Sequence, residues 1–247
     1  MPSIEPEFRV AIFADCHLPL ESGHSDFETF LHTFEQVAKQ AETIVLLGDV
    51  FQVWAAVPVF DHENGRKLLA LIESLSGSCR TIMVEGNWDF YIRKSFFAYF
   101  DEVSEDAVEI DSRGEHLVFV HGHMDHLFSD RLLMWVLKSR LTCALFKTKL
   151  FSSLARKLNR KFKEGEFSKQ VQPNELLKVA DRLIKRFPGS DRIFAGHFHT
   201  FFQHGAVTVL PDYHSNGAFL GLSDKPALYR FDHDQIVPVS GLGNRRE

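Results

Sequence analysis

Seven side chains that could bind a metal stand in short clusters along this 247-residue chain. They are carboxylates, imidazoles and one amide, with no thiolate among them: Asp15, His17, Asp49, Asn87, His121, His197 and His199. Such mixed oxygen and nitrogen ligands suit Mn, Fe or Zn better than Mg or Ca, which prefer shells of oxygen alone. A single catalytic ion keeps one coordination position open for water or substrate and uses fewer than seven protein ligands. We therefore expect two divalent ions that share a carboxylate.

Each cluster directly follows a run of apolar residues rich in Val, Ile and Phe. The runs cover residues 10–14, 43–47, 81–84, 117–120 and 192–195. Continuous apolar runs of this length are typical of strands buried on both faces. Any one cluster alone also fits a turn or a helix cap. Five clusters in the same position after a strand favour a common ligand site.

The segments between these runs predict how the strands are arranged. Residues 27–40 and 65–76 have apolar residues at helical spacing, which indicates βαβ units and a parallel sheet. Polar residues after such strands meet at the carboxyl edge of the sheet, where ligands bind in open α/β folds. Beyond the last cluster we expect antiparallel strands that close a second sheet, at residues 206–210, 218–222, 227–231 and 235–239.

Residues 131–163 differ from the rest of the chain. They contain ten Lys and Arg residues and no Asp or Glu, whereas the whole chain has a formal net charge of -5. Apolar residues recur among the cations at steps of three and four, which predicts basic amphipathic helices. We expect a lid insertion at 127–172, core segments at 1–126 and 173–239, and a disordered tail at 240–247. The lid surface fits an anionic membrane; the alternative is a solvated basic face that covers a sheet edge.

The composition excludes several classes of protein. Cys16, Cys79 and Cys143 are far apart, so neither a disulfide framework nor a thiolate zinc site is expected. No apolar run reaches the roughly 18 residues that span a bilayer, and the acidic N-terminal segment is unlike a signal peptide. Nucleic acid is not an expected partner, because the basic window carries no recognition motif. We expect a cytoplasmic protein that is peripherally associated with the cytoplasmic face of the inner membrane.

The clusters resemble, in order and spacing, the motifs of the calcineurin-like metallophosphoesterases. The resemblance covers residues 9–231 and rests on Phe13-Ala14-Asp15-Cys16-His17, Gly48-Asp49, Gly86-Asn87-x-Asp89, Val120-His121-Gly122-His123 and Gly196-His197-Phe198-His199. It implies an α/β fold, a four-layer α/β/β/α sandwich with an inserted helical lid, and a two-metal site. By resemblance, Asp15, His17, Asp49 and His199 hold one metal. Asp49, Asn87, His121 and His197 hold the other, so that Asp49 is shared.

Within that superfamily the chain is more similar to the UDP-2,3-diacylglucosamine diphosphatases of lipid A biosynthesis. The added support comes from Leu18, Val50-Phe51, Trp54, Phe90, the basic insertion and Leu210-Pro211-Asp212-Tyr213. This resemblance implies cleavage of UDP-2,3-diacylglucosamine to UMP and diacylglucosamine 1-phosphate, usually with Mn and with the acyl chains under the lid.

Trp88 departs from both groups. Many superfamily members have a histidine here that is thought to protonate a leaving alkoxide, and the resembled diphosphatases usually have an arginine that contacts the diphosphate. An indole donates one hydrogen bond and does neither job. A phosphate leaving group, whose second pKa is about 6, needs no general acid. Trp88 therefore favours hydrolysis of a diphosphate over hydrolysis of an alkyl monoester.

Several further residues are candidates for substrate contacts. The missing positive charge could come from Arg93, Lys94, Arg131 or Lys169, although each also fits a plain surface position. His123 stands where the resembled family usually has Asp, and Asp130 belongs to a reduced acidic cluster; both would affect the head group. Trp88 itself would be a wall against the lid or a stacking face for the substrate.

Together with these patterns, the resemblance implies a two-metal pyrophosphate hydrolase that acts on UDP-2,3-diacylglucosamine or a close nucleotide-linked glycolipid. Asn87 and His121 would stabilise charge on phosphoryl oxygens, and Asp89 would orient a ligand histidine. Two alternatives remain open at this point. One is a metallophosphoesterase that acts on soluble phosphodiesters or phosphomonoesters, and the other is a non-catalytic metal-binding interaction protein.

Overall fold

The computed structural model describes residues 7–56, 61–123, 171–233 and 235–239. The expected lid and the C-terminal tail lie outside this range, so their boundaries stay predictions. Among the described helices, none is both long and apolar enough to cross a membrane.

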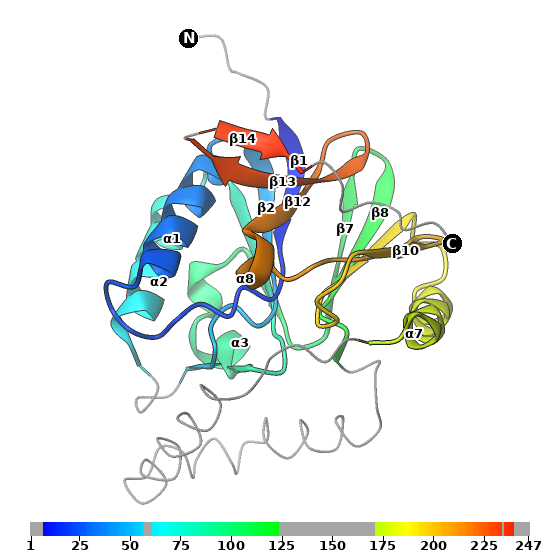
Figure 1. Ribbon diagram of the computed structural model, residues 1–247, viewed down its shortest axis with the longest axis horizontal. Coiled ribbons are helices and arrows are strands. Elements are labelled where there is room, and N and C mark those ends of the chain that lie inside the picture. The colour runs from blue at the N-terminus through cyan, green and yellow to red at the C-terminus, as the bar shows by residue number, and fades with distance from the viewer. Residues whose placement is uncertain (1–6, 57–60, 124–170, 234, 240–247) are drawn as a thin grey trace, which may run out of the picture.

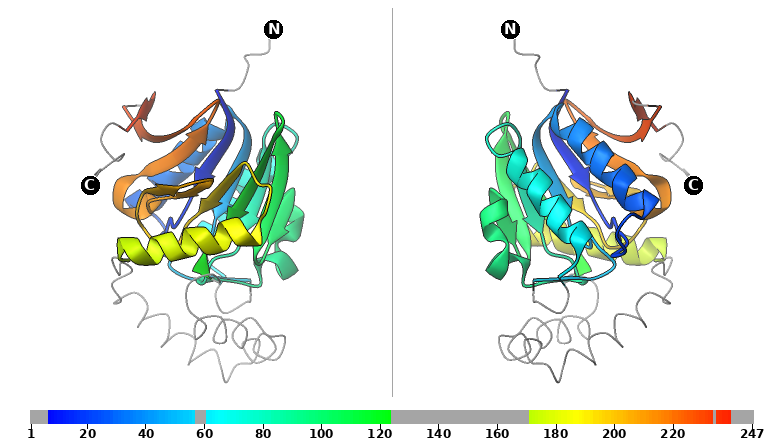
Figure 2. Two further views of the ribbon diagram at one scale, coloured as in Figure 1. Left: turned by 90° about the vertical axis from the view of Figure 1, so that its right-hand side faces the viewer. Right: turned by 90° about the vertical axis from the view of Figure 1, so that its left-hand side faces the viewer.

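The described residues form four layers (Figures 1 and 2). From left to right in Figure 1, α1 (Ser25–Ala38) and α2 (Glu63–Ser74) cover one face of a seven-stranded sheet, a five-stranded sheet lies on its other side, and α7 (Pro173–Arg186) covers the outer face of that second sheet. This arrangement confirms the α/β sandwich expected from the sequence. Both predicted helices begin two residues earlier than expected. Their first turns are polar and are capped by the side chains of His24 and His62, so the spacing of apolar residues does not show where these helices start.

The seven-stranded sheet has the order β14-β13-β12-β1-β2-β4-β6. Its parallel part consists of β1 (Phe8–Phe13), β2 (Ala41–Leu47), β4 (Arg80–Val84) and β6 (Glu102–Ser104), which confirms the predicted βαβ units. The antiparallel part consists of β12 (Ala218–Leu222), β13 (Pro226–Asp232) and β14 (Gln235–Pro238). The prediction that these last strands close the second sheet was wrong. β12 pairs with β1 instead, with Val10 opposite Leu222.

The five-stranded sheet has the order β10-β11-β9-β8-β7. Its strands are β7 (Ala107–Ser112), β8 (Glu115–Val120), β9 (Arg192–Ala195), β10 (Phe202–His204) and β11 (Val207–Val209). The neighbours β8, β9 and β11 are parallel. Thus only one of the four expected C-terminal strands, β11, belongs to this sheet. β7 was not predicted, because only Val108 and Ile110 of this edge strand are buried.

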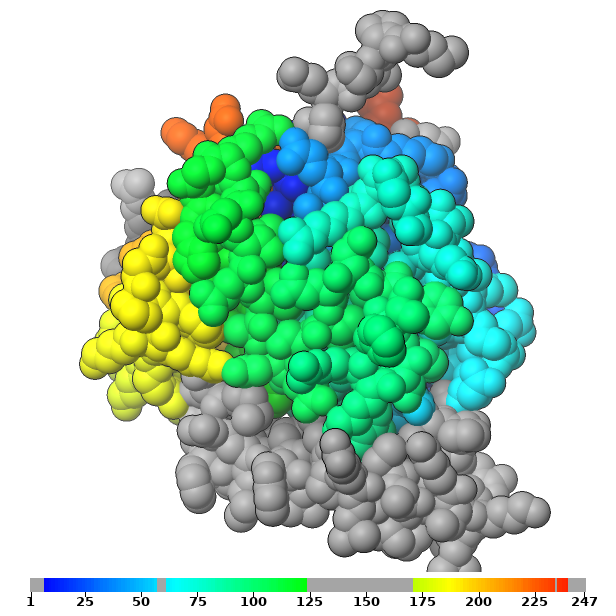
Figure 3. Space-filling model, turned by 180° about the vertical axis from the view of Figure 1, so that it is seen from behind, coloured from blue at the N-terminus to red at the C-terminus, as the bar shows by residue number. Residues whose placement is uncertain are grey.

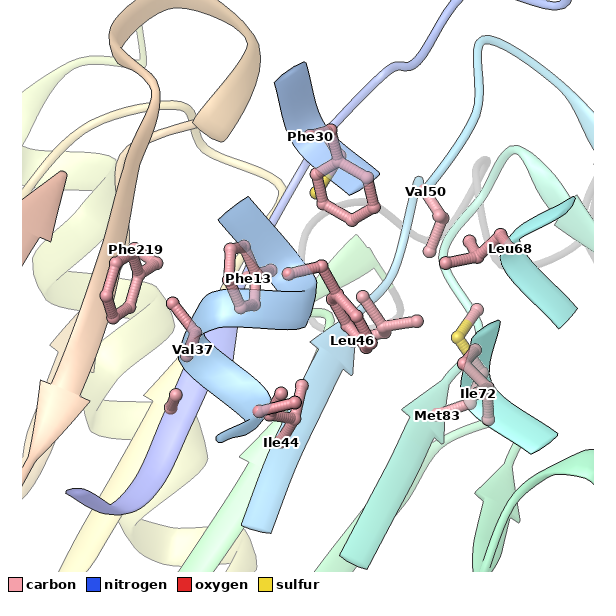
Figure 4. Packing of buried hydrophobic residues seen from close by; sticks show 14 of the residues in the cluster. Phe13, Phe30, Val37, Ile44, Leu46, Val50, Leu68, Ile72, Met83 and Phe219 are labelled. Atoms are coloured by element: carbon pink, nitrogen blue, oxygen red, sulfur yellow. The ribbon is translucent and has the colours of Figure 1, made fainter. Parts of the chain in front are cut away.

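Three apolar cores hold the layers together. The first lies between the seven-stranded sheet and its two helices, where the ring of Phe13 stacks on Phe219 at 5.1 Å and meets Phe30 at 5.7 Å. Figure 4 shows side chains of the strands beside those of the helices, for example Met83 of β4 next to Ile72 of α2. The second core fills the space between the sheets, and the third lies under α7. Because burial on both faces fixes the strands, the loops at their carboxyl ends are fixed as well.

Short elements lie between the main strands and helices. They are β3 (Trp54–Ala55), β5 (Asp89–Phe90), α3 (Ile92–Ser95), the 3₁₀ turn η2 (Phe97–Tyr99) and α8 (Tyr213–Asn216). β3 pairs with β5 in a two-stranded ribbon, and the backbone N–H of Trp54 donates to the carbonyl of Trp88 at 2.9 Å. Figure 3 shows the molecule from behind, where the green residues between β5 and β8 lie beside the cyan α2. The ribbon thus ties the loop that contains Asn87 to the loop that follows β2.

Candidate metal centre

The loops after five strands converge on one site that lies between the two sheets. In the first sheet, β1 is followed by Asp15 and His17, β2 by Asp49, and β4 by Asn87. In the second sheet, β8 is followed by His121, and β9 is followed by His197 and His199. Hydrogen bonds join neighbouring loops. The N–H of His17 donates to the carbonyl of Asp49 at 2.9 Å, and the N–H of His197 donates to Asp15 Oδ2 at 2.8 Å. The structure therefore brings together all seven residues that the sequence indicates as ligands.

Six of the seven form two groups of three. One group is Asp15, His17 and His199, the other is Asp49, His121 and His197, and within each the ligand atoms lie within 4.8 Å of one another. The groups adjoin: Asp15 Oδ1 lies 3.4 Å from His199 Nε2 and 3.9 Å from His121 Nε2. This grouping agrees with the two ligand sets that the resemblance implies. The role of Asp49 as the shared ligand stays a prediction.

The backbone of the ligand loops is strained. Eight described non-glycine residues have a positive φ, and five of them are candidate ligands: Asp15 (50°), His17 (40°), Asp49 (51°), His197 (73°) and His199 (51°). Left-handed conformations cost an L-residue roughly 1–2 kcal/mol each. Such strain persists only where the surrounding structure enforces it, and it concentrates at functional sites. The conformations aim these side chains at one another, and the local sequence alone would not produce them.

Two glycines let the loops approach one another. A Cβ on Gly48 would lie 2.2 Å from His121 Nδ1, and a Cβ on Gly86 would lie 2.1 Å from Asp49 Oδ1. Contacts this short are not possible, so any side chain at these positions would displace a ligand. Gly48 also has a φ of +79°, which favours glycine on its own account.

The orientation of His121 is set by a carbonyl group. Its Nδ1 lies 2.9 Å from the oxygen of Leu47, and because a carbonyl only accepts, Nδ1–H must be the donor. In the neutral ring Nε2 then carries the lone pair, and this atom lies 3.1 Å from Asn87 Oδ1 and 3.5 Å from Asp49 Oδ2. A fixed tautomer with its free nitrogen facing other ligands is the arrangement that a metal-binding histidine needs.

Asp89 supports the site by accepting hydrogen bonds from the backbone of two ligand loops. Its Oδ2 accepts from the backbone N–H of Asp49 at 2.6 Å and from that of Gly86 at 2.9 Å. Asp89 is fully buried. These bonds hold the backbone on which Asp49 and Asn87 stand. The expected role of Asp89 in orienting a ligand histidine stays a prediction.

The charges of the site are strongly coupled. Burial disfavours the imidazolium of His121, but the carboxylates of Asp49 and Asp15 outweigh burial and raise its pKa to about 9. Burial likewise opposes ionisation of Asp49, yet His121 holds the pKa of that carboxyl far below its usual range. The pKa of Asp15 is lowered for the same reason, by His121 and His199. The two carboxylates thus remain ionised in a buried place and call for positive charge beside them.

The residues present fit two divalent ions. His17 Nε2 and His199 Nε2 face each other at 3.3 Å, a separation that requires either a proton or a cation between two imidazole nitrogens. Buried carboxylates, fixed imidazoles and an amide oxygen, with no thiolate within the described site, are the ligands that Mn, Fe and Zn accept. The identity of the metal stays a prediction.

The predicted substrate contacts are placed in part. His123 is buried beside the second group, with its ring 5.3 Å from that of His121 and 6.3 Å from that of His197. Arg93 is exposed, and Lys94 Nζ lies 3.6 Å from Glu105 and over the ring of Tyr91. Asp130, Arg131 and Lys169 fall outside the described residues. All of these contacts stay predictions.

Two residues near the site were missed from sequence. The exposed His214 on α8 has its ring 6.4 Å from that of His17, and its N–H donates to the carbonyl of Asp15 at 3.4 Å. Glu85 is fully buried and accepts from the N–H of Arg93 at 2.8 Å. A carboxylate at the end of an apolar run, directly before Gly86, was a signal that could have found Glu85. No local pattern marks His214.

The chain is similar to a known protein family and to several known proteins. Residues 8–201 match the family of calcineurin-like phosphoesterases. UDP-2,3-diacylglucosamine hydrolase of Aliivibrio fischeri is 24% identical over 238 residues, which cover 87% of this chain and 95% of the relative. The protein of the same name from Ectopseudomonas mendocina is 28% identical over 204 residues, which cover 77% and 81%.

A solved structure of a Streptococcus pneumoniae protein described as a predicted phosphoesterase aligns with a TM-score of 0.44 at 12% identity, over 93% of this chain and 97% of that one. The family match covers most of the chain and includes all seven candidate ligands. The chain therefore belongs to the calcineurin-like phosphoesterases.

Proposed function

We propose that this metallophosphoesterase is a two-metal pyrophosphate hydrolase that cleaves UDP-2,3-diacylglucosamine, or a close nucleotide-linked glycolipid, to UMP and diacylglucosamine 1-phosphate. The observation that carries the proposal is the pair of adjoining ligand groups, Asp15 with His17 and His199, and Asp49 with His121 and His197. The choice of substrate is supported by the relatives named UDP-2,3-diacylglucosamine hydrolase, which align over most of this chain.

The first ligand group would hold one ion, and the second, completed by Asn87, would hold the other. When bound, divalent ions supply positive charge to the phosphoryl oxygens and make a bound water acidic enough to attack phosphorus at neutral pH. Mn is the first candidate, with Fe or Zn possible. Such ions would also balance the ionised carboxylates of Asp15 and Asp49.

The chain's own residues position this chemistry. Leu47 fixes His121 so that Nε2 faces the site, and Asp89 fixes the backbone of the loops on both sides. A rigid arrangement stabilises developing charge without having to reorganise during the reaction. We assign to Asn87 and His121 the stabilisation of charge on the phosphoryl oxygens.

The half-buried Trp88 supports a diphosphate as the substrate. Its indole N–H cannot protonate a leaving group, and a leaving phosphate with a second pKa of about 6 needs no proton. An alkoxide leaving group would lack the general acid, which typically contributes about 10²- to 10⁴-fold.

The basic segment 131–163 is proposed to contact both the acyl chains of the substrate and the membrane surface. Ten Lys and Arg residues and no acidic residue fall within 131–163, interspersed with apolar residues. A basic apolar segment of this kind would suit the phosphates and acyl chains of the substrate and would rest on the anionic cytoplasmic face of the inner membrane.

The test uses the full-length protein with Mn²⁺ and UDP-2,3-diacylglucosamine in ¹⁸O-labelled water. We expect release of UMP and of diacylglucosamine 1-phosphate, with ¹⁸O in only one of the two products. Bis(p-nitrophenyl) phosphate serves as a generic phosphodiester for comparison. If the protein cleaves the generic diester but releases no UMP, the proposed lipid substrate is wrong and the protein is a phosphoesterase of another specificity.

A further inference from the structure

A pocket of about 380 Å³ lies beside the N-terminus of α2, and none of the seven candidate metal ligands lines it. Its apolar walls come from β3, from α2 and from residues 96–99, and they include Trp54, Leu69, Phe96 and Tyr99. The rings of Trp54 and Phe96 lie 5.8 Å apart. A volume of this size with mostly apolar walls and a few polar groups is typical of a pocket that binds a small molecule.

His62 supplies one polar group of the pocket. Its Nδ1 accepts from the N–H of Gly65 at 3.0 Å, so in the neutral ring the hydrogen is on Nε2. Burial lowers the pKa of His62 to about 4, which keeps the ring neutral near pH 7. Nε2 is buried and meets no acceptor within the described part of the chain. A buried N–H without an acceptor costs about 1–3 kcal/mol, so a ligand that brings an acceptor would be favoured.

Trp54 supplies a second donor at the same place. A Cβ built on Gly65 would lie 3.2 Å from His62 Nε2 and 3.3 Å from Trp54 Nε1, so both nitrogens border the space above this glycine. An indole nitrogen only donates. The pocket therefore presents two N–H groups to one point and suits a ligand atom that accepts twice, such as a carbonyl oxygen.

Gly65 keeps that space open. It is a buried residue in the first turn of α2, and it is not among the described glycines with a positive φ. The backbone therefore does not require glycine here, and glycine destabilises a helix by roughly 0.5–1 kcal/mol relative to alanine. The clearance between the two N–H groups is what an alanine would remove.

The pocket adjoins the metal centre. The N–H of Trp54 donates to the carbonyl of Trp88 at 2.9 Å, and the N–H of Trp88 donates to Asp49 Oδ1 at 2.8 Å. One residue thus separates the Asp49 carboxylate from the main chain of Trp54, a span of at most roughly 10 Å. Because β2 and β4 are parallel, the helix between them begins at the carboxyl edge, where the metal ligands lie. A nucleotide with its phosphate at the metal centre would bring its base to this pocket.

We propose that the pocket formed by His62, Trp54 and Gly65 is the base subsite for the nucleotide half of the substrate, and that it selects uracil over cytosine. The 4-position of a pyrimidine lies opposite the ribose, so it enters the pocket first. Uracil has an oxygen there, which accepts from both N–H groups. Cytosine has an amino group there, and its hydrogens would face two donors. The inference rests on the proposed function, from which it takes a nucleotide substrate cleaved at the metal centre.

The test is titration calorimetry of UMP and CMP into the full-length protein in the presence of Mn²⁺. These two ligands differ only at the 4-position and the neighbouring ring nitrogen. Wild-type protein should bind UMP about 10-fold more tightly than CMP, because CMP leaves two donors without an acceptor. Inorganic phosphate serves as a probe of the metal centre alone.

Two variants remove the subsite in different ways. Trp54→Phe deletes one donor and keeps an aromatic ring, so the affinity for UMP should fall about 3- to 10-fold while that for CMP changes by less than about 2-fold. Gly65→Ala fills the space between the donors and should reduce the preference for UMP over CMP to less than about 2-fold. Alanine is the better helix former, so this variant should fold, as judged by circular dichroism. Both variants should bind inorganic phosphate as wild type does.

Three results would overturn the proposal. The first is an equal affinity of wild-type protein for UMP and CMP. The second is a preference for UMP that survives both substitutions. The third is a loss of phosphate affinity in both variants as large as the loss of UMP affinity, which would mean that these residues act through the metal centre and not on the base.

The outcomes also separate this inference from the proposed function. If UDP-2,3-diacylglucosamine is cleaved although UMP and CMP bind equally, the base subsite is wrong and the proposed function stands. If UMP is preferred and Gly65→Ala abolishes the preference, but the glycolipid is not cleaved, the subsite stands and the lipid substrate is wrong.

Discussion

At the scale of single residues, position 48 has room only for glycine, because the side chain of His121, which follows β8 of the other sheet, lies against it. A Cβ there would lie 2.2 Å from His121 Nδ1 and 2.9 Å from the Cα of Gly86. We expect Gly48→Ala to abolish metal-dependent hydrolysis of bis(p-nitrophenyl) phosphate, because His121 must move. It should also lower the free energy of unfolding in urea by about 3 kcal/mol, from overpacking and strain.

Gly77 supplies a matched control for this substitution. Its φ of +81° is nearly that of Gly48, but nothing lies within 4 Å of a Cβ built on it. Gly77→Ala should therefore show only the conformational cost, about 1 kcal/mol, with full hydrolysis. Equal activities of the two variants would contradict the clearance argument.

The type of each ligand could be predicted from sequence, but its backbone conformation could not. Asp15, Asp49 and His197 were visible because each follows an apolar run that ends in a polar cluster. Their positive φ angles arise from hydrogen bonds between loops, such as that of the N–H of His197 to Asp15, which join distant parts of the chain. His214 was missed for the same reason, since its approach to His17 depends on how α8 returns to β1.

At the scale of elements, the N-terminus of α2 depends on a half-buried histidine, His62. His62 Nδ1 accepts from the N–H of Gly65 at 3.0 Å, and burial lowers the pKa of His62 to about 4. In the unfolded chain the pKa is about 6.5. Between these values the unfolded state binds more protons, so the contribution of His62 is complete above about pH 6.5 and is lost as the pH falls through 4.

We expect the free energy of unfolding in urea to fall between pH 7.5 and pH 5 by roughly 1–3 kcal/mol on account of His62. His62→Asn keeps a capping side chain that does not titrate, so this part of the fall should disappear. His24→Asn is the matched cap substitution, on α1, where the side chain is 41% exposed. A pH dependence identical in wild type and His62→Asn would contradict this account.

A buried arginine joins the two sheets at the end opposite the metal centre. Arg9 on β1 donates to the carbonyl of Ser112 at 2.9 Å and pairs with Glu115 at the start of β8, which also accepts from Arg192 Nε at 3.0 Å. Glu115→Ala would leave a buried guanidinium without its counter-charge. We expect this change to lower the free energy of unfolding by about 3 kcal/mol.

Urea unfolding of three variants would check this clamp. Adding Arg9→Met to Glu115→Ala removes the stranded charge and should recover part of the loss. Asp232→Ala breaks an exposed pair with Arg230 and should cost less than about 1 kcal/mol. A Glu115→Ala variant as stable as Asp232→Ala would refute the role of the clamp.

The elements themselves were predictable where their contacts are local. The βαβ units of β1, β2 and β4 follow from apolar runs and intervening helical spacing. The sheet to which β12 belongs did not follow, because Ala218–Leu222 is buried throughout and would suit the middle of either sheet. Its partner is β1, about 200 residues away, and no local pattern records such a pairing.

At the scale of the whole molecule, the metal centre joins the two halves of the sandwich. Asp15, Asp49 and Asn87 come from the first sheet, and His121, His197 and His199 from the second. Without ions the site contains buried carboxylates and five strained ligand positions. Because the ligands come from both sheets, ions bound at this site would stabilise the packing of one sheet against the other, in addition to the ligand loops.

We therefore expect the whole fold to be stabilised by metal. Mn²⁺ at about a thousand times its dissociation constant stabilises a folded protein by about 4 kcal/mol, which for a chain of this size raises Tm by about 10 °C. Differential scanning calorimetry of protein treated with EDTA, before and after addition of Mn²⁺, measures this shift. His199→Ala and Asp49→Ala should each lose most of it, because one variant opens the first ligand group and the other opens the second. Gly77→Ala, a change on the surface far from both groups in sequence, should keep the full shift. A Tm that does not respond to Mn²⁺ in the wild-type protein would mean that the converging loops do not bind this ion, whatever their resemblance to a metal centre.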